Sequence, residues 1–462
     1  MFKQKLFNIL PNLFQNFLIS ILNFRNNKKR FGVIYKSFLY EFKNNNNLSL
    51  KELKEIQKKK FEFLVRNSIQ KSSFYKRIYS EIKNPEKIKN LTNLPILKKD
   101  LLKANIDDII TINYNQGIIS KTGGTTGKSM QVLFTKQDFQ QRFAALDNFR
   151  SNFGYRLGKK TAWFSGKSFI SEKDVKKGIF WKTDYFHNIR YYSTFHIKNS
   201  FLNSYLKDLI RYRPEYMSGF PSSIADLARH GNKNSFDFPK GVVKAIFTTS
   251  ETLTDDMRLS IETFFKAKIY NQYSASEGAP FIFECPKNNL HLDLQSGVFE
   301  VLDNNDKPTN SGRLIVTSFT SKGTPLIRYD IGDSIELSNK SCKCGNNNPI
   351  IKKILGREDD FLYSHENGKM NLVNLANSIK DVKGLMKTQF VQNDLNKIII
   401  NLVVNNNKFD AYQKSIFLKN IRLRLGEKIN IQLNLMDNIP NTKSGKFRFV
   451  INNIKNHIPT NE

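Results

Sequence analysis

Cysteines and long apolar runs are scarce in this chain. It has three cysteines in 462 residues, and such a small, odd number favours metal ligands or free thiols over disulfides. No unbroken apolar run reaches the length of a transmembrane helix, and no small-residue cleavage site follows the apolar residues near the N-terminus. We therefore expect a cytoplasmic protein, neither membrane-spanning nor secreted.

Acidic residues are also in short supply. The chain carries 73 Lys and Arg against 41 Asp and Glu, a formal net charge of +32, which by itself would suggest a nucleic-acid partner. The basic residues are spread along the whole chain, however, and form no block interleaved with aromatic residues. Asn and Ile are abundant alongside Lys, as in proteins of AT-rich genomes. We interpret most of the charge as compositional and expect no specific nucleic-acid partner.

The first 60 residues are predicted to form a basic, helical segment, with 13 Lys and Arg against 3 Glu. Apolar side chains recur at helical spacing around Pro11, where we expect a helix to begin. One interpretation is an interfacial helix on the cytoplasmic leaflet, with the cations of residues 28–30 nearby. The other, which we favour as the usual role of such a stripe, is packing on the main domain. The stripe consists of Leu6, Leu10, Leu13, Phe14, Phe17, Leu18 and Ile21.

The middle of the chain alternates strand and helix patterns, as an α/β fold requires. Residues 245–249 and 268–271 are predicted strands, and between them a helix is expected to begin at Thr254 or Asp255 and to end at Phe265. Open α/β sheets bind their ligands beyond the carboxyl ends of the strands. The polar residues that follow these two strands are therefore site candidates.

The chain changes character after Gly356. Residues 398–404 and 429–435 are predicted strands, separated by a helix over residues 412–425 that Gly426 closes. This pattern indicates a small α+β domain of ordinary size. We predict three parts: an N-terminal helical segment (residues 1–60), a large domain with mixed sheets and helices (61–356) and a small, mobile C-terminal α+β domain (357–462).

A loop of glycine and threonine follows residue 121, between predicted strands over residues 117–120 and 130–134. Glycine permits close approach of phosphate oxygens to backbone N–H groups, and threonine adds hydroxyl donors. The loop is not a P-loop, because Thr122 stands where the first glycine of G-x-x-x-x-G-K-[ST] is required. Lys128 suits a phosphate contact and a solvent-exposed lysine equally well. The candidate residues are Thr122, Gly123, Gly124, Thr125, Thr126, Gly127 and Lys128.

Further motifs follow in a fixed order: YSASEG at 273–278, RYDIGD at 328–333, GREDD at 356–360 and NTKSGKFR at 441–448. With the loop, this ordered set resembles the adenylate-forming (acyl-activating) superfamily, with Ser129 in place of a common proline. Segments 249–254, 271–280 and 317–328 resemble, more narrowly, the phenylacetate–CoA ligase branch. Within that branch the similarity is to members found in capsule and surface-polysaccharide biosynthesis.

The resemblance implies roles for single residues. The loop would hold the β- and γ-phosphates of ATP, and Glu277 would bind Mg²⁺. Lys446 would bridge the substrate carboxylate and the α-phosphate, where charge develops in the transition state. Asp333 would accept hydrogen bonds from the ribose, and Asp359 would be the hinge of the small domain. The other cofactor contacts implied are Ser250, Glu251, Tyr273, Ser276 and Arg357.

All three cysteines and one histidine form a possible metal site. Cys285 and His291 lie six positions apart, and Cys342 and Cys344 follow later. Three thiolates and one imidazole make a complete tetrahedral zinc set, which would be structural because no position is left for water. Unligated buried thiols are the alternative, since Cys-x-Cys is less diagnostic than paired C-x-x-C motifs.

These inferences predict an enzyme that uses ATP and Mg²⁺ to convert a small carboxylic acid into an acyl-adenylate. By resemblance, the acyl acceptor is coenzyme A. Transfer to an amine such as an amino sugar, and adenylylation of a cofactor, are the alternatives within the same chemistry. A scaffold with a decayed site and a basic nucleic-acid-binding protein are more remote. The acid and the oligomeric state stay open.

Overall fold

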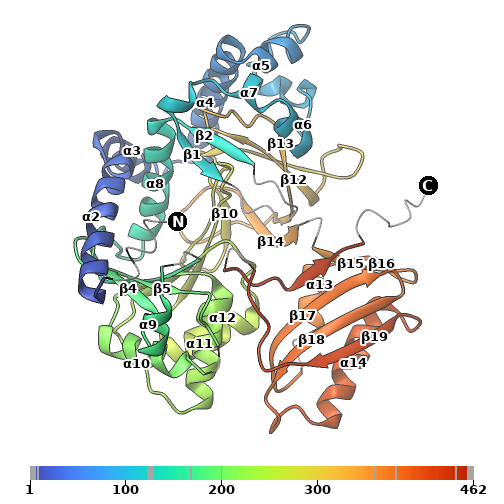
Figure 1. Cartoon of the computed structure of the whole chain (residues 1–462). Helices are drawn as coiled ribbons and strands as arrows, with labels where there is room; N and C mark the ends of the chain where they lie inside the picture. The colour runs from blue at the N-terminus through green and yellow to red at the C-terminus, as the bar shows by residue number, and fades with distance from the viewer. Residues whose placement is uncertain are drawn as a thin grey trace.

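One twelve-stranded sheet runs through most of the molecule, in the order β11-β12-β13-β14-β10-β9-β8-β7-β6-β3-β5-β4 (Figure 1). The computed structural model describes residues 7, 10–121, 130–166, 169–198, 200–357, 360–379, 382–442 and 445–454. The strands of this sheet are β3 (Thr161–Ser165), β4 (Trp181–Asp184), β5 (Ile189–Ser193), β6 (Tyr216–Gly219), β7 (Ala245–Thr248), β8 (Ile269–Tyr273), β9 (Ile282–Glu284), β10 (Leu290–Leu292), β11 (Gly297–Leu302), β12 (Ser311–Ser318), β13 (Tyr329–Leu337) and β14 (Ile350–Arg357).

The half of the sheet from β5 to β8 is parallel, and β4 adds an antiparallel edge. Parallel strands need crossover connections, which here are helices. The helices α10 (Leu202–Tyr212), α11 (Pro221–Lys233) and α12 (Asp255–Phe265) share an apolar cluster with one face of these strands. Helix α8 (Lys136–Ser151) packs on the other face through Phe149 and Phe247. The carboxyl ends of β7 and β8 are thereby held in fixed positions.

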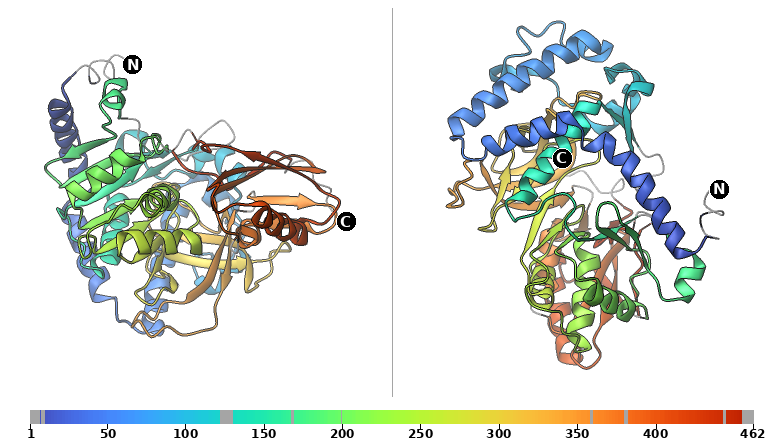
Figure 2. Two further views of the ribbon diagram at one scale, coloured as in Figure 1. Left: turned by 90° about the horizontal axis from the view of Figure 1, so that it is seen from below. Right: turned by 90° about the vertical axis from the view of Figure 1, so that its left-hand side faces the viewer.

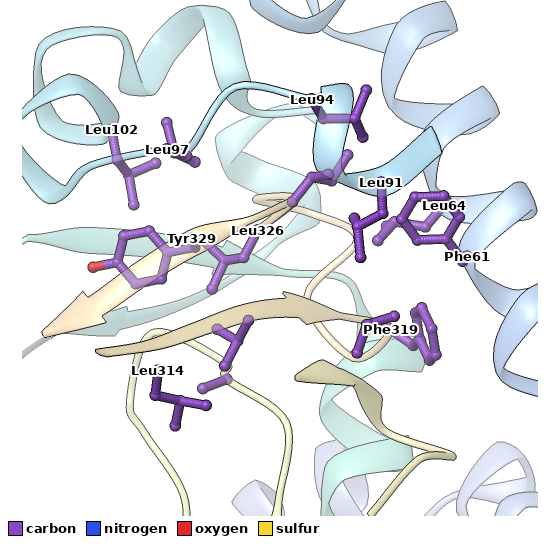
Figure 3. Close-up of a cluster of buried hydrophobic side chains, with 14 of the residues drawn as sticks. Phe61, Leu64, Leu91, Leu94, Leu97, Leu102, Leu314, Phe319, Leu326 and Tyr329 are labelled. Atoms are coloured by element: carbon purple, nitrogen blue, oxygen red, sulfur yellow. The ribbon is translucent and has the colours of Figure 1, made fainter. Parts of the chain in front are cut away.

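The half from β9 to β14 is antiparallel and covers a second core. Figure 3 shows Phe61 and Leu64 of α4 (Leu50–Lys71) beside Leu91, and Leu326 and Tyr329 in the same cluster. The short elements of this part of the chain are α5 (Ser73–Ile78), η1 (Ile88–Asn93), α6 (Lys99–Ala104), α7 (Ile106–Ile109) and η2 (Tyr114–Gln116), whereas α9 (Glu172–Lys176) packs on the first cluster through Val175. The predicted boundary at residue 60 falls inside α4, and the division into three parts remains a prediction.

A four-stranded sheet, β19-β18-β17-β20, forms the core of the C-terminal part (Figure 1). Helices α13 (Leu372–Ile379) and α14 (Ala411–Leu425) share one apolar cluster with this sheet, for example through Leu375, Phe417 and Phe390. The strands are β17 (Leu385–Asp394), β18 (Lys397–Val404), β19 (Asn430–Leu435) and β20 (Val450–Asn452), and a separate hairpin consists of β15 (Phe361–Ser364) and β16 (Gly368–Asn371).

The locally encoded elements agree with the prediction. Thr254 caps α12, since its hydroxyl accepts a hydrogen bond from the backbone N–H of Met257 at 3.3 Å. Helix α14 ends at Gly426, whose φ of +90° suits a residue without a Cβ. Strands β1 (Ile118–Lys121) and β2 (Gln131–Phe134) pair antiparallel on either side of the Gly/Thr loop, as expected.

Helix α2 (Asn12–Arg30) begins directly after Pro11, as predicted, and is followed by α3 (Val33–Asn44). It packs on β4 and α8, but through its polar side: Gln15, Asn16 and Ser20 are its buried residues. The expectation that the apolar stripe is the packing face is therefore wrong, because Leu13, Phe14, Phe17 and Leu18 are exposed. Among the described helices, none is long and apolar enough to cross a membrane.

Candidate active site

Tyr273, Asp333 and Arg357 form a hydrogen-bonded and charged group at the middle of the sheet. The Tyr273 hydroxyl at the end of β8 donates to Asp333 Oδ2 at 2.6 Å. Asp333 and Arg357 face each other in the β13–β14 register, and Asp333 Oδ1 lies 3.7 Å from Arg357 Nε. Burial raises the pKa of Asp333, while Arg357 and the Tyr273 hydroxyl oppose this shift. The predicted ribose-binding carboxylate thus comes with two partners that fix its orientation.

Glu277 lies just past β8 and is buried, with only 7% of its surface exposed. The Ser276 hydroxyl lies 3.3 Å from Glu277 Oε2, and the Ser276 carbonyl accepts a hydrogen bond from Ser120 Oγ at 2.9 Å. Ser120 belongs to β1, so the start of the Gly/Thr loop is tied to the segment that carries Glu277. The loop residues 122–128 and the predicted hinge Asp359 lie outside the described residues.

Arg142 on α8 is a site residue that the sequence interpretation missed. Its buried guanidinium donates to the carbonyls of Ala275, Gly278 and Ala279 at 2.9–3.2 Å and to the Thr320 hydroxyl at 2.7 Å. Burial lowers its pKa to about 10, and the carboxylates of Asp138 and Glu277 oppose that shift. Arg142 therefore fixes the backbone on both sides of Glu277. Its sequence signal is weak, because an arginine within a polar helix is normally exposed.

Lys446 reaches this group from the C-terminal part of the chain, at the end of a tight turn. Gly445 has a φ of +77°, and its N–H donates to the Thr442 carbonyl at 2.8 Å. A Cβ at Gly445 would come within 2.9 Å of the Gly166 Cα, so only glycine fits there. Burial and Arg357 lower the pKa of Lys446, while the carboxylates of Glu251, Glu277 and Asp333 raise it. The ammonium of Lys446 therefore lies within the field of all three carboxylates.

Glu251 holds the C-terminal turn in place. Its carboxylate accepts hydrogen bonds from the backbone N–H groups of Phe447 at 2.7 Å and Ser222 at 3.2 Å. Burial raises the pKa of Glu251, and these donors and Lys446 oppose the shift. The preceding Ser250 is exposed and has a φ of +70°, a rare conformation for a residue with a side chain. Such a backbone turns the chain sharply at the end of β7 and directs Glu251 toward the C-terminal turn.

The three cysteines and His291 meet at the β9–β10 end of the sheet, where their ligand atoms all lie within 4.8 Å of one another. The Cys285 and Cys342 sulfurs are 3.6 Å apart, and Cys344 Sγ lies 3.5 Å from His291 Nε2. His291 Nδ1 is hydrogen-bonded to the Asn348 carbonyl at 2.9 Å. The imidazole thus carries its proton on Nδ1 and presents the Nε2 lone pair to the thiols, as in zinc sites.

Taken together, the site combines two cationic side chains, three carboxylates and the phenol of Tyr273. Arg357 and Lys446 can neutralise phosphate oxygens, and Asp333 can accept hydrogen bonds from a diol. A divalent cation can bind at Glu277. This set suits a reaction in which two anions, a nucleotide and a carboxylate, have to approach each other.

Comparison with known proteins agrees with this chemistry. Residues 362–453 match the family described as the CapK C-terminal domain. Over 458 residues the chain is 36% identical to Protein CapK of Staphylococcus aureus, which covers 97% of this chain and 99% of that protein. The chain belongs to the CapK family.

More distant relatives of this CapK-family protein connect it to acyl-CoA ligases. It is 23% identical over 335 residues to a phenylacetate-coenzyme A ligase of Thermus thermophilus, covering 68% of this chain and 72% of that one. Its fold matches 2-hydroxyisobutyryl-CoA ligase in the postadenylation state with a TM-score of 0.72, at 15% identity over 88% of this chain and 91% of that one. The superfamily resemblance drawn from the motifs and the predicted fold class are both confirmed.

The likeness depends on the conformation of the neighbour. Against the same ligase in an open conformation, the TM-score falls to 0.58, with 88% of this chain and 93% of that one covered. The fold of the CapK-family chain thus matches the postadenylation structure with a higher TM-score than it matches the open one. In this structure Lys446 is near enough to Glu277 and Asp333 for both carboxylates to raise its pKa.

Proposed function

We propose that this protein is an ATP- and Mg²⁺-dependent ligase that activates a small carboxylic acid as an acyl-adenylate and transfers the acyl group to coenzyme A. The observation that carries the proposal is the docking of the turn around Lys446 on Glu251, through the Phe447 N–H at 2.7 Å, where Glu277 and Asp333 also raise the pKa of Lys446. The relatives named as CoA ligases support coenzyme A as the acceptor.

In the first half-reaction a carboxylate oxygen attacks the α-phosphorus of ATP, and the bond from that phosphorus to the bridging oxygen of pyrophosphate breaks. The Lys446 ammonium stabilises the charge that develops between the two anions. Asp333, oriented by Tyr273 and Arg357, accepts hydrogen bonds from the ribose. Residues 122–128 hold the phosphates that leave. In the second half-reaction the thiolate attacks the acyl carbon, and AMP departs.

Two metals belong to the proposal. Glu277 suits Mg²⁺, which prefers oxygen ligands and needs only one protein carboxylate beside water and phosphate oxygens. Cys285, His291, Cys342 and Cys344 suit a structural Zn²⁺. The fit of the second set rests on the 4.8 Å grouping of its ligand atoms and on the Nδ1 hydrogen bond, which leaves Nε2 free to coordinate.

The acceptor and the biological setting form the finer part of the proposal. Because the motifs resemble those of enzymes of surface-polysaccharide biosynthesis, we propose that the product is used in that process. An amine of an amino sugar is the alternative acceptor, and transfer of the adenylyl group to a cofactor is a further one. In the last case the AMP moiety would stay with the product.

The test is carboxylate-dependent exchange of labelled pyrophosphate into ATP, across panels of aromatic, short-chain and amino-acid carboxylates with Mg²⁺. The proposal predicts exchange with one class of acid and none without acid. Adding coenzyme A should then yield a thioester and free AMP. Pyrophosphate exchange followed by amide formation with an added amine would show that the acyl acceptor is an amine and not coenzyme A. No exchange with any acid, despite ATP binding, would contradict the proposal.

A further inference from the structure

Helix α2 is fixed to the large domain by a specific set of polar contacts. The Asn16 Oδ1 accepts a hydrogen bond from the Thr183 N–H at 3.0 Å, and Ser20 Oγ accepts one from the Tyr185 N–H at 2.9 Å. Asn23 Nδ2 donates to Asp184 Oδ2 at 2.9 Å. At the start of the helix, Asn12 Oδ1 accepts a hydrogen bond from the buried Lys182 ammonium at 3.0 Å. The register of α2 against β4 is therefore determined, and its outward face is determined with it.

That outward face is apolar. Leu13, Phe14, Phe17, Leu22 and Phe24 are each at least half exposed, between 50% and 66%. At 100° per residue they spread over one half of the helix circumference, and the buried Asn16 and Ser20 lie on the other half. Figure 1 places α2 at the left edge of the molecule, and the right-hand view of Figure 2 shows no described element across its outer side.

The β4–β5 turn extends this surface. Phe186, 51% exposed, makes edge-to-face contacts with Phe17 and Phe24, each with ring centroids 6.1 Å apart. Tyr185 beside it is 47% exposed. A contiguous apolar patch that specific contacts keep outward is typical of an interaction site. We call the outward side chains of α2 with Tyr185 and Phe186 the α2 face.

The charge around the α2 face has one sign. Residues 10–40 contain five Lys and Arg and no acidic residue. Arg25, Lys28 and Lys29 are exposed, and the Lys28 ammonium lies 5.3 Å above the Phe24 ring. Phenylalanine and leucine flanked by lysine and arginine are the composition of helices that lie in the interface of an anionic bilayer.

We propose that the α2 face docks the protein on the surface of an anionic lipid membrane, with the helix parallel to the bilayer. Charge complementarity favours lipid over a second copy of the chain. A two-fold contact would bring identical cationic faces together with no acidic residue between them, whereas anionic head groups supply the missing charge. The small domain lies on the opposite side of the molecule from α2 (Figure 1), so docking leaves it unobstructed.

The test is cosedimentation of the full-length protein with vesicles of phosphatidylcholine alone and with vesicles of equal parts phosphatidylcholine and phosphatidylglycerol. We expect binding to the anionic vesicles only. The double variant Phe17→Asn/Leu22→Asn should lower the partition coefficient by about tenfold or more. Its matched control is Leu259→Asn/Leu423→Asn, which removes two leucines that are 69% and 68% exposed on α12 and α14. That control should bind as the wild type does.

Two charge-reversal variants distinguish binding through the α2 face from nonspecific attraction by the overall charge of +32. Lys28→Glu/Lys29→Glu should abolish binding to the anionic vesicles, whereas Lys58→Glu/Lys59→Glu, the same change on an exposed stretch of α4, should retain most of it.

Equal losses of binding in the two charge-reversal variants, with no effect of Phe17→Asn/Leu22→Asn, would mean nonspecific attraction and overturn the proposal. Self-association that Phe17→Asn/Leu22→Asn abolishes, without vesicle binding, would overturn it in favour of a dimer. All four variants change exposed positions away from the active site, so their melting temperatures should match that of the wild type.

Discussion

Arg142 shows how much of the candidate site depends on one buried side chain. Its guanidinium offers donors in a fixed planar fork, and four of the groups it meets belong to the segments around Glu277 and Thr320. A buried carbonyl without a donor is costly. The position of Glu277 thus depends on the hydrogen bonds of Arg142 as much as on the residues next to Glu277 in the sequence.

Arg142→Lys should therefore destabilise the protein although the charge is retained. A single ammonium cannot reach the carbonyls of Ala275, Gly278 and Ala279 together, and we expect a loss of about 2–4 kcal/mol in the free energy of unfolding. Urea denaturation measures this loss. Arg156→Lys, at an exposed position just after the same helix, is the matched control and should be neutral. Equal stability of the two variants would contradict the role given to Arg142.

Asp293 makes stability depend on pH. It is 8% exposed, and burial raises its pKa to about 6, against the opposing effects of Ser296 and Lys60. The folded protein therefore holds this proton more tightly than the unfolded chain does. As the pH rises from about 4 through 6, the group disfavours folding progressively, by up to about 3 kcal/mol in total.

Asp293→Asn removes this titration. The variant should gain stability relative to the wild type as the pH rises from about 4 to 7, and the difference should then level off. Chemical denaturation across this range measures it. Asp100→Asn, whose wild-type side chain is 97% exposed, is the control and should show a constant difference. If the difference in unfolding free energy between Asp293→Asn and the wild type were also independent of pH, burial would not raise the pKa of Asp293.

At the scale of elements, the sequence predicted structure that depends on neighbouring residues and missed structure that depends on contacts between distant residues. The strand β7, the helix α12 and its cap Thr254 could be read from apolar pattern and cap chemistry, because both act within a few residues. The orientation of α2 could not, because it depends on hydrogen bonds that Asn16 and Ser20 accept from Thr183 and Tyr185, more than 160 positions away. Arg142 was missed for the same reason.

The cysteine cluster joins β9 and β10 to the loop after β13, and a metal there would tie these elements together. His291→Asn should reduce the zinc content from about one per chain to background, and lower the melting temperature. A chelator should lower the melting temperature of the wild type but not that of the variant. His365→Asn, at an exposed histidine of the small domain, is the control and should keep zinc. A wild-type protein without zinc would remove the metal from the account.

At the scale of the whole molecule, the contacts that hold the C-terminal part against the rest of the chain include an ion pair and a backbone hydrogen bond. Lys387 of β17 is paired with Asp226 of α11 at 3.1 Å and is only 8% exposed. Phe447 donates its N–H to Glu251 at 2.7 Å. Both contacts join the domains in the arrangement that brings Lys446 into the site. Rotation of the small domain about the predicted hinge would have to break them, and the sequence could not reveal either contact.

The central claim, that the two domains together build an adenylation site, is tested most directly through Lys446. Carboxylate-dependent pyrophosphate exchange should fall by about a thousandfold in Lys446→Ala, because the charge that develops between the two anions loses its counter-ion, while ATP binding is largely retained. Lys408→Ala, at an exposed lysine of the same domain, should exchange as the wild type does. Full exchange activity in Lys446→Ala would contradict the account.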